Sequence, residues 1–154
     1  MKSELQIFKV DTSTKSKFAI LTTKVKAGGY GSFESAALDF PDDTIDLLKV
    51  LIKDKETVFF AKVSGDSLNG IGIYDEDLLI IQKGMLPRYD DVIVVYLSDE
   101  FFVKKYRPKY KENSAELQSI KLKSENPNYS DLFADENSDF IFWGVVTWNL
   151  HKLR

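Results

Sequence analysis

Residues 91–106 read DVIVVYLSDEFFVKKY. Two runs rich in β-branched and aromatic residues, 92–97 and 100–106, flank the polar pair Ser98-Asp99, a pattern typical of a β-hairpin with a tight turn. Runs of similar length and composition occupy residues 58–63, 77–81, 116–123 and 139–148. Short strands at regular spacing predict a mostly-β body built from a folded-over sheet.

The chain before this body has a different character. One short helix is predicted to open at Asp42-Asp43-Thr44, because acidic residues suit a helix N-terminus and apolar residues follow at helical spacing. Residues 1–27 are interpreted as an arm with two small apolar clusters, 5–10 and 18–21, either of which suits a short docking strand. Gly28, Gly29 and Gly31 then predict a flexible, accessible backbone.

Charge and composition separate this arm from the rest of the chain. Residues 1–27 hold six lysines and two acids, for a net charge of +4, whereas residues 28–154 carry −7. Opposite charges favour the arm lying on the body, although a solubilising tail has the same composition. There is no cysteine, so thiolate chemistry and disulfides are excluded. Without a signal-like start or an apolar run near the roughly 18 residues of a membrane span, we expect a cytoplasmic protein with no membrane partner.

A candidate nucleophile stands directly after the strand expected at 58–63. There the chain reads Ser64-Gly65-Asp66-Ser67-Leu68, and a strand that breaks in this way lifts a hydroxyl out of the sheet beside free backbone N–H groups. Those of Asp66 and Ser67 are the candidates to hold a developing oxyanion. Taken alone, the same four residues are also ordinary turn chemistry.

A serine hydroxyl needs a base. His151, the single histidine, is the fourth residue from the C-terminus, and we expect it in a solvated tail. A lysine can serve when burial lowers its free pKa of about 10.4. Strand alternation predicts that either Lys104 or Lys105 points inward. The alternative is that both extend along an edge strand into solvent.

Four ordered blocks then carry a family resemblance, at residues 63–68, 72–81, 90–95 and 100–106. With the closing Phe-Trp-Gly-Val-Val at 142–146, they resemble the LexA/UmuD family of self-cleaving Ser-Lys peptidases over about residues 58–148, and most closely its UmuD branch. The resemblance implies a β-clip type of folded sheet, with Ser67 as nucleophile and Lys104 as base. It implies no cofactor and no metal.

The resemblance also implies a cut in the chain's own arm. Val25-Lys26-Ala27-Gly28 is similar to the family's cleavage site, which gives a cleavable arm, 1–27, and a peptidase domain, 28–154. The small Ala27 suits a tight pocket, and Gly28 lets the backbone approach the nucleophile. The bond Gly28–Gly29 stays an alternative, because this chain has a second glycine where the family usually has a bulkier residue.

The function implied is that of a UmuD-like protein of the SOS response to DNA damage. Such a protein forms a homodimer, is cut when bound to a RecA–single-stranded DNA filament, and then serves a UmuC-like translesion polymerase. The alternatives are a LexA-like or phage-type repressor and a signal-peptidase-like processing protease. A repressor needs several helices for a helix-turn-helix, a pattern that residues 1–27 lack, so we do not expect direct DNA binding.

Two charged segments have their own interpretations. A basic stretch, Lys104 to Lys111, is interleaved with Tyr106 and Tyr110, as in surfaces that bind single-stranded nucleic acid, but a solvated hairpin is the favoured interpretation. The acids Asp75, Glu76 and Asp77 lack the spacing of a calcium loop and are interpreted as a charged turn before a strand.

Overall fold

The computed structural model describes residues 5–9, 17–19 and 44–154. Its contacts divide the chain into two compact units, one of residues 1–10 with 54–154 and the other of residues 11–53. In the described part of the chain, no helix is long and apolar enough to cross a membrane. The predicted boundary between residues 27 and 28 lies outside the described residues and stays a prediction.

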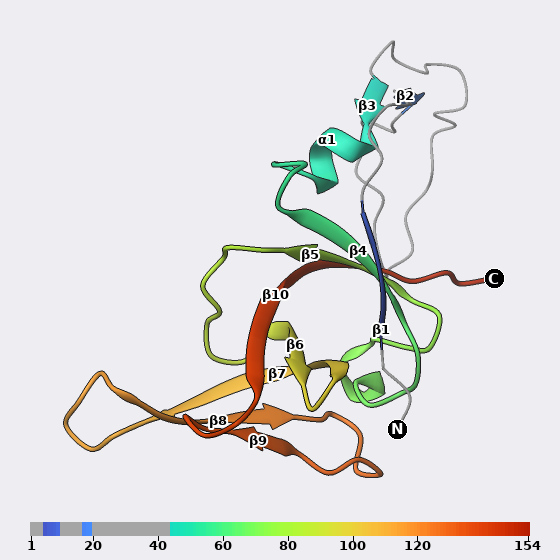
Figure 1. Cartoon of the computed structure of the whole chain (residues 1–154). Helices are drawn as coiled ribbons and strands as arrows, with labels where there is room; N and C mark the ends of the chain where they lie inside the picture. The colour runs from blue at the N-terminus through green and yellow to red at the C-terminus, as the bar shows by residue number, and fades with distance from the viewer. Residues whose placement is uncertain (1–4, 10–16, 20–43) are drawn as a thin grey trace, which may run out of the picture. The chain divides into compact units, whose positions relative to one another are not determined.

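The larger unit is one antiparallel sheet in the order β1-β4-β5-β10-β6-β7-β8-β9 (Figure 1). Its strands are β1 (Leu5–Lys9), β4 (Val58–Val63), β5 (Leu78–Gln82), β6 (Val92–Leu97), β7 (Glu100–Tyr110), β8 (Leu117–Lys123), β9 (Leu132–Ala134) and β10 (Phe140–Leu150). The sheet curls until β1 lies close to β7. The predicted mostly-β fold with a folded-over sheet is therefore confirmed.

The hairpin of residues 91–106 forms as predicted. Strands β6 and β7 pair from Val92↔Lys105 to Leu97↔Glu100. Ser98 and Asp99 join them with φ of 51° and 65°, the left-handed backbone that a two-residue hairpin turn of the favoured type requires. The second strand continues to Tyr110, beyond the predicted end.

The core explains why the central strands read as unbroken apolar runs. Val94 and Val103 belong to one buried cluster, whereas Ile93, Val95 and Phe102 belong to a second. Because successive side chains of a strand point to opposite faces, β6 and β7 are covered on both faces. Alternation between polar and apolar residues is lost in such strands.

The smaller unit holds a two-stranded sheet and the helix. β2 (Lys17–Ala19) pairs with β3 (Thr44–Asp46), and α1 (Leu47–Leu51) follows directly. The predicted helix start at Asp42 to Thr44 is therefore wrong for Thr44. Thr44 and Ile45 are β-branched and favour extended backbone, and the carboxylate of Asp46 caps the helix by accepting from the Lys49 N–H at 3.3 Å. Both apolar clusters of the arm contribute to strands, β1 and β2.

Candidate active site

Ser67 lies on a tight turn between β4 and the short 3₁₀-helix η1 (Asn69–Ile71). The strand ends at Val63, and Gly65 adopts a φ of +103°, which turns the backbone away from the sheet and suits only glycine. The Gly65 N–H donates to Oδ1 of Asp75 at 2.7 Å. Leu68, directly after Ser67, is buried in the core and anchors the far side of the turn.

The Ser67 hydroxyl meets the amine of Lys104. Nζ of Lys104 lies 2.8 Å from Oγ of Ser67 and donates a hydrogen bond to it. Both residues are buried, with 5% of Ser67 and 2% of Lys104 exposed. The prediction that one of two adjacent lysines points inward is confirmed, because Lys105 lies on the opposite face of β7. The edge-strand alternative is wrong, since β7 lies between β6 and β8.

The loop after β8 holds the turn of Ser67 through its backbone. The Glu125 N–H donates to the Ser67 carbonyl at 2.9 Å, and the Gly70 N–H donates to the Glu125 carbonyl at 3.0 Å. A Cβ on Gly70 would lie 2.2 Å from the Glu125 carbonyl oxygen, so only glycine allows this approach. The two segments are thereby fixed against each other on either side of the nucleophile.

Asn126 and Tyr129 hold the neighbouring Asp66. Nδ2 of Asn126 donates to the Asp66 carbonyl at 2.9 Å and to Oδ2 of Asp66 at 3.2 Å, and the Tyr129 hydroxyl donates to Oδ1 at 2.6 Å. Within the described ranges, no acceptor takes the N–H groups of Asp66 and Ser67.

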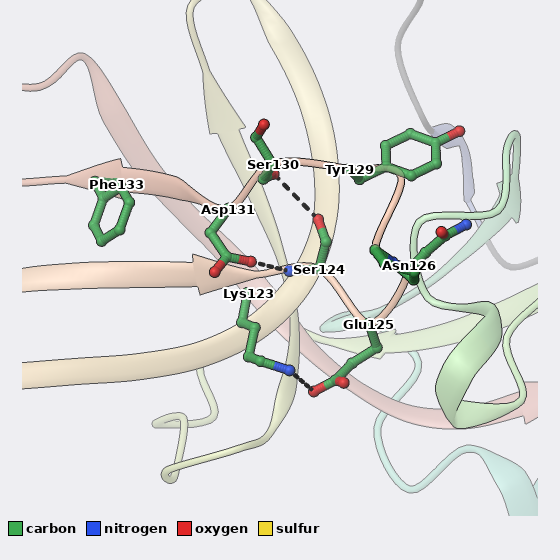
Figure 2. Close-up of a pocket in the computed structure, with 9 residues that line it drawn as sticks. Lys123, Ser124, Glu125, Asn126, Tyr129, Ser130, Asp131 and Phe133 are labelled. Atoms are coloured by element: carbon green, nitrogen blue, oxygen red, sulfur yellow. Dashed lines mark hydrogen bonds and ion pairs between the residues drawn. The ribbon is translucent and has the colours of Figure 1, made fainter.

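The loop that carries Asn126 and Tyr129 also lines a pocket of about 690 Å³ (Figure 2). Its lining residues are Lys123, Ser124, Glu125, Asn126, Pro127, Tyr129, Ser130, Asp131 and Phe133. Most of these side chains are polar. The pocket and the turn of Ser67 therefore share the same supporting loop.

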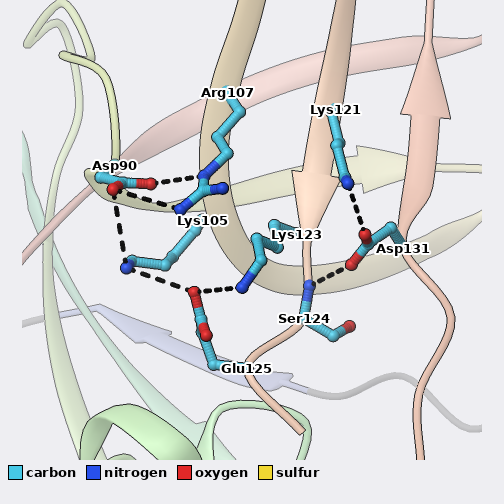
Figure 3. Close-up of polar contacts among 8 residues, drawn as sticks. All are labelled: Asp90, Lys105, Arg107, Lys121, Lys123, Ser124, Glu125 and Asp131. Atoms are coloured by element: carbon cyan, nitrogen blue, oxygen red, sulfur yellow. Dashed lines mark hydrogen bonds and ion pairs between the residues drawn. The ribbon is translucent and has the colours of Figure 1, made fainter. Parts of the chain in front are cut away.

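A layer of ion pairs covers the β7–β8 face beside this loop (Figure 3). Glu125 binds Lys123 at 2.7 Å and Lys105 at 3.3 Å, Asp90 binds Arg107 at 2.6 Å, and Asp131 binds Lys121 at 2.8 Å. The hydrogen bond from Lys123 is the main cause that lowers the pKa of Glu125, with a further hydrogen bond from Lys105. The Glu125 carboxylate is thus paired with two lysines, and the backbone N–H of the same residue donates to the Ser67 carbonyl.

Two residues of the basic stretch 104–111 belong to this layer of ion pairs. In the first part of this stretch, the ion-paired cations and the aromatic lie on opposite faces, because Lys105 and Arg107 take part in the ion pairs while Tyr106 packs against the apolar cluster behind them. Lys104 is buried at the Ser67 contact. Lys109, Tyr110 and Lys111 are exposed where β7 ends, so the interpretation as a solvated hairpin stays a prediction.

His151 lies in the exposed segment after β10, as expected for a solvated tail, but it is anchored there by Asp77. Its Nδ1 lies 2.5 Å from Oδ1 of Asp77, which is only 2% exposed. Asp77 also accepts from the Tyr74 N–H at 2.9 Å and from Nδ2 of Asn149 at 2.9 Å. The acids 75–77 form a turn before β5, as predicted. Asp77 is buried, however, and its carboxylate binds Asn149 and His151 of the C-terminal segment.

Burial acts to raise the pKa of Asp77. Hydrogen bonds from the Tyr74 N–H, His151 and Asn149 outweigh it, so the pKa lies below its usual range. The carboxylate is therefore charged at neutral pH, and it organises a structural network with no serine or lysine in it.

The residues of the expected cut, Ala27 and Gly28, lie outside the described residues, as does the alternative bond to Gly29. Of the residues predicted for the site, the structure brings Ser67 and Lys104 together, whereas the oxyanion role of the Asp66 and Ser67 N–H groups stays a prediction. Sequence-based prediction missed Asn126, Tyr129 and Gly70. The sequence gives no signal for Asn126, because its contact to Asp66 spans 60 residues.

Comparison with known proteins agrees with this fold. A model of the family described as peptidase S24-like matches residues 19–147. Protein SamA of Salmonella typhimurium is 30% identical over 135 residues, which cover 88% of this chain and 86% of SamA. Protein ImpA of Escherichia coli is 27% identical over 79% of this chain and 78% of ImpA. The LexA repressor of Clostridium perfringens (strain 13 / Type A) is 32% identical over 56% of this chain and 39% of the repressor.

Fold, site and comparisons together define a class of proteins that are generally self-cleaving serine peptidases. The chain belongs to the peptidase S24-like family, within its LexA/UmuD group.

Proposed function

We propose that this protein cuts its own chain between Ala27 and Gly28, with Ser67 as nucleophile and Lys104 as general base. The observation that carries the proposal is the buried contact of 2.8 Å between Nζ of Lys104 and Oγ of Ser67. A nucleophile within hydrogen-bond reach of its base is the arrangement that covalent catalysis requires.

The chemistry follows from the two groups. The neutral amine of Lys104 takes the proton of Ser67 as Oγ attacks the carbonyl carbon of Ala27. The N–H groups of Asp66 and Ser67 donate to the resulting oxyanion. The C–N bond then breaks, and the ammonium of Lys104 returns the proton to the leaving amine of Gly28. Water hydrolyses the ester, with Lys104 again accepting a proton, and Ser67 is regenerated.

The test is the intact mass of the purified chain during incubation at mildly alkaline pH. We expect loss of residues 1–27, and no loss in Ser67→Ala or Lys104→Ala. Lys109→Ala is the matched control, because Lys109 is an exposed lysine of the same strand. Cleavage at Gly28–Gly29 would be recognised by a fragment heavier by one glycine. Normal processing in both dyad variants would end the assignment.

For the biological role, we propose a UmuD-like protein of the SOS response whose product acts as an accessory subunit of an error-prone translesion polymerase. The chain aligns with SamA and ImpA along most of both lengths. This match supports a UmuD-like protein. A cytoplasmic homodimer that meets a RecA filament and a UmuC-like polymerase is part of the same proposal.

The decisive measurement for this role is cleavage with and without a RecA–single-stranded DNA filament. We expect the filament to accelerate the cut. A cut whose rate per molecule is independent of protein concentration would be intramolecular and would exclude a signal-peptidase-like protease that processes other chains. Sequence-specific binding of the uncut chain to duplex DNA would instead favour the repressor alternative.

A further inference from the structure

The N-terminal strand β1 is seated on the edge of β4 along its whole length. The register runs antiparallel from Leu5↔Val63 to Lys9↔Phe59, and β1 is an outermost strand of the sheet (Figure 1). The strand that leads to Ser67 is therefore covered, on one edge, by residues from the start of the chain.

The seating buries side chains as well as pairing the backbone. Leu5 is 6% exposed and belongs to the same cluster as Ala61, Val63 and Leu68, and Ile7 packs against that cluster. Gln6 and Phe8 point the other way and are exposed. A strand therefore fits this edge when it carries apolar side chains at two alternate positions. The side chains between them face outward and can be polar or apolar.

The proposed cut has a consequence for this strand. Residues 5–9 lie in the same larger unit as the body, but they are joined to it covalently only through the segment that contains residues 27 and 28. Cleavage turns β1 into part of a separate peptide, while its backbone ladder and the buried Leu5 are left unbroken. The cut and the removal of the arm are two different events.

We propose that the β4 edge is a strand-binding site whose occupant is Leu5–Lys9 of the chain itself, which stays bound after the cut as a dissociable peptide. Only its departure opens the β4 edge and the side of the apolar cluster that Leu5 covers. The inference rests on the proposed function for the natural cut, but the site exists however the chain is severed.

The experiment severs the chain without its own chemistry. A Ser67→Ala chain carries the recognition sequence of a foreign protease between Ser13 and Thr14, outside the described residues. Hydrogen exchange of residues 58–63 is then measured before and after the foreign cut, over a series of protein concentrations. We expect exchange at high concentration to match the uncut chain and to rise on dilution as the peptide leaves.

Added peptides identify what the edge recognises. After the severed peptide is dialysed away, a synthetic peptide of residues 3–10 should restore protection of residues 58–63. Leu5→Asp in that peptide should weaken binding about 10- to 100-fold, as expected for loss of a buried leucine. Gln6→Asp is the matched control with the same added charge at an exposed position, and it should bind within a few-fold of the natural peptide.

Two results would overturn the proposal. One is exchange in residues 58–63 that jumps to its maximum at every concentration once the chain is severed and is not restored by peptide. The other is equal binding of the Leu5→Asp and Gln6→Asp peptides. Neither result touches the assignment of Ser67 and Lys104, because self-cleavage is disabled throughout.

Discussion

Nδ2 of Asn126 lies 2.9 Å from the carbonyl oxygen of Asp66, across a sequence separation of 60 residues. The same nitrogen reaches Oδ2 of Asp66, and Asn126 is 5% exposed. This amide therefore fixes the peptide unit between Asp66 and Ser67, whose N–H is one of the proposed oxyanion donors. Asn126 acts as a positioning residue, because it touches the turn and not the reacting atoms.

Replacing Asn126 by Ala is expected to slow self-cleavage without abolishing it. The substitution leaves the Asp66 carbonyl without one of its donors, at a cost of about 1–3 kcal/mol. The rate measured by intact mass should fall by roughly 10- to 100-fold, since each 1.4 kcal/mol is a factor of ten. Asn128→Ala is the control, because Asn128 is exposed. An unchanged cleavage rate in Asn126→Ala would mean that the turn of Ser67 keeps its conformation without the Asn126 hydrogen bonds.

Gly70→Ala tests the close approach of the two segments. The new Cβ would lie 2.2 Å from the Glu125 carbonyl oxygen, so the loop must move. The hydrogen bond from the Glu125 N–H to the Ser67 carbonyl is then lost. We expect loss of stability of roughly 1–3 kcal/mol, as for overpacking, together with slower cleavage.

Gly72→Ala is the comparison for Gly70→Ala. A Cβ there meets open space, but φ is +81°, so only backbone strain of about 1–2 kcal/mol applies. Thermal unfolding measures both costs. Cleavage should be impaired in Gly70→Ala and retained in Gly72→Ala; the reverse order would contradict the contact.

Asp77→Asn should reveal a pH-dependent share of stability. The pKa of Asp77 is lowered in the fold, so its contribution is present above the unfolded value of about 3.9 and is lost as pH falls through the folded value. The variant should therefore unfold more readily than the natural chain at pH 7, with a difference that shrinks below about pH 4.

Glu76→Gln provides the control at the adjacent position. Glu76 forms an exposed ion pair with Lys62, and such pairs contribute about 0–1 kcal/mol. The free energy of unfolding of the two variants, measured with denaturant across pH, distinguishes the buried, hydrogen-bonded carboxylate of Asp77 from the exposed one of Glu76. A destabilisation by Asp77→Asn that stays constant down to pH 2 would contradict the sign argued for this carboxylate.

The strands and the dyad could be predicted because both leave local signals. Apolar runs separated by turn residues marked six strands. Alternation predicted that one of Lys104 and Lys105 faces inward, and the family resemblance selected Lys104. The 3-residue β9 and the contacts of Asn126 and His151 left none, since each depends on which distant segment the fold brings alongside. The start of α1 was missed because Thr44 and Ile45 pair as β3 before Asp46 caps the helix.

Leu5→Ala is expected to destabilise the uncut chain by about 2–4 kcal/mol, as for other buried leucines. Phe8→Ala removes a larger side chain from the same strand, but Phe8 is 42% exposed, so the cost should be smaller. Chemical denaturation of both variants on a Ser67→Ala background gives the comparison. Equal or reversed costs would mean that β1 does not seat Leu5 in the core.

The protonation state of Lys104 decides whether the dyad works, because an ammonium has no lone pair to accept the Ser67 proton. Lys104→Arg keeps a positive charge that is never lost near neutral pH, so it should not cleave. Lys109→Arg, on the exposed end of the same strand, should keep the natural cleavage rate, measured by intact mass. Cleavage by Lys104→Arg would show that another group accepts the proton.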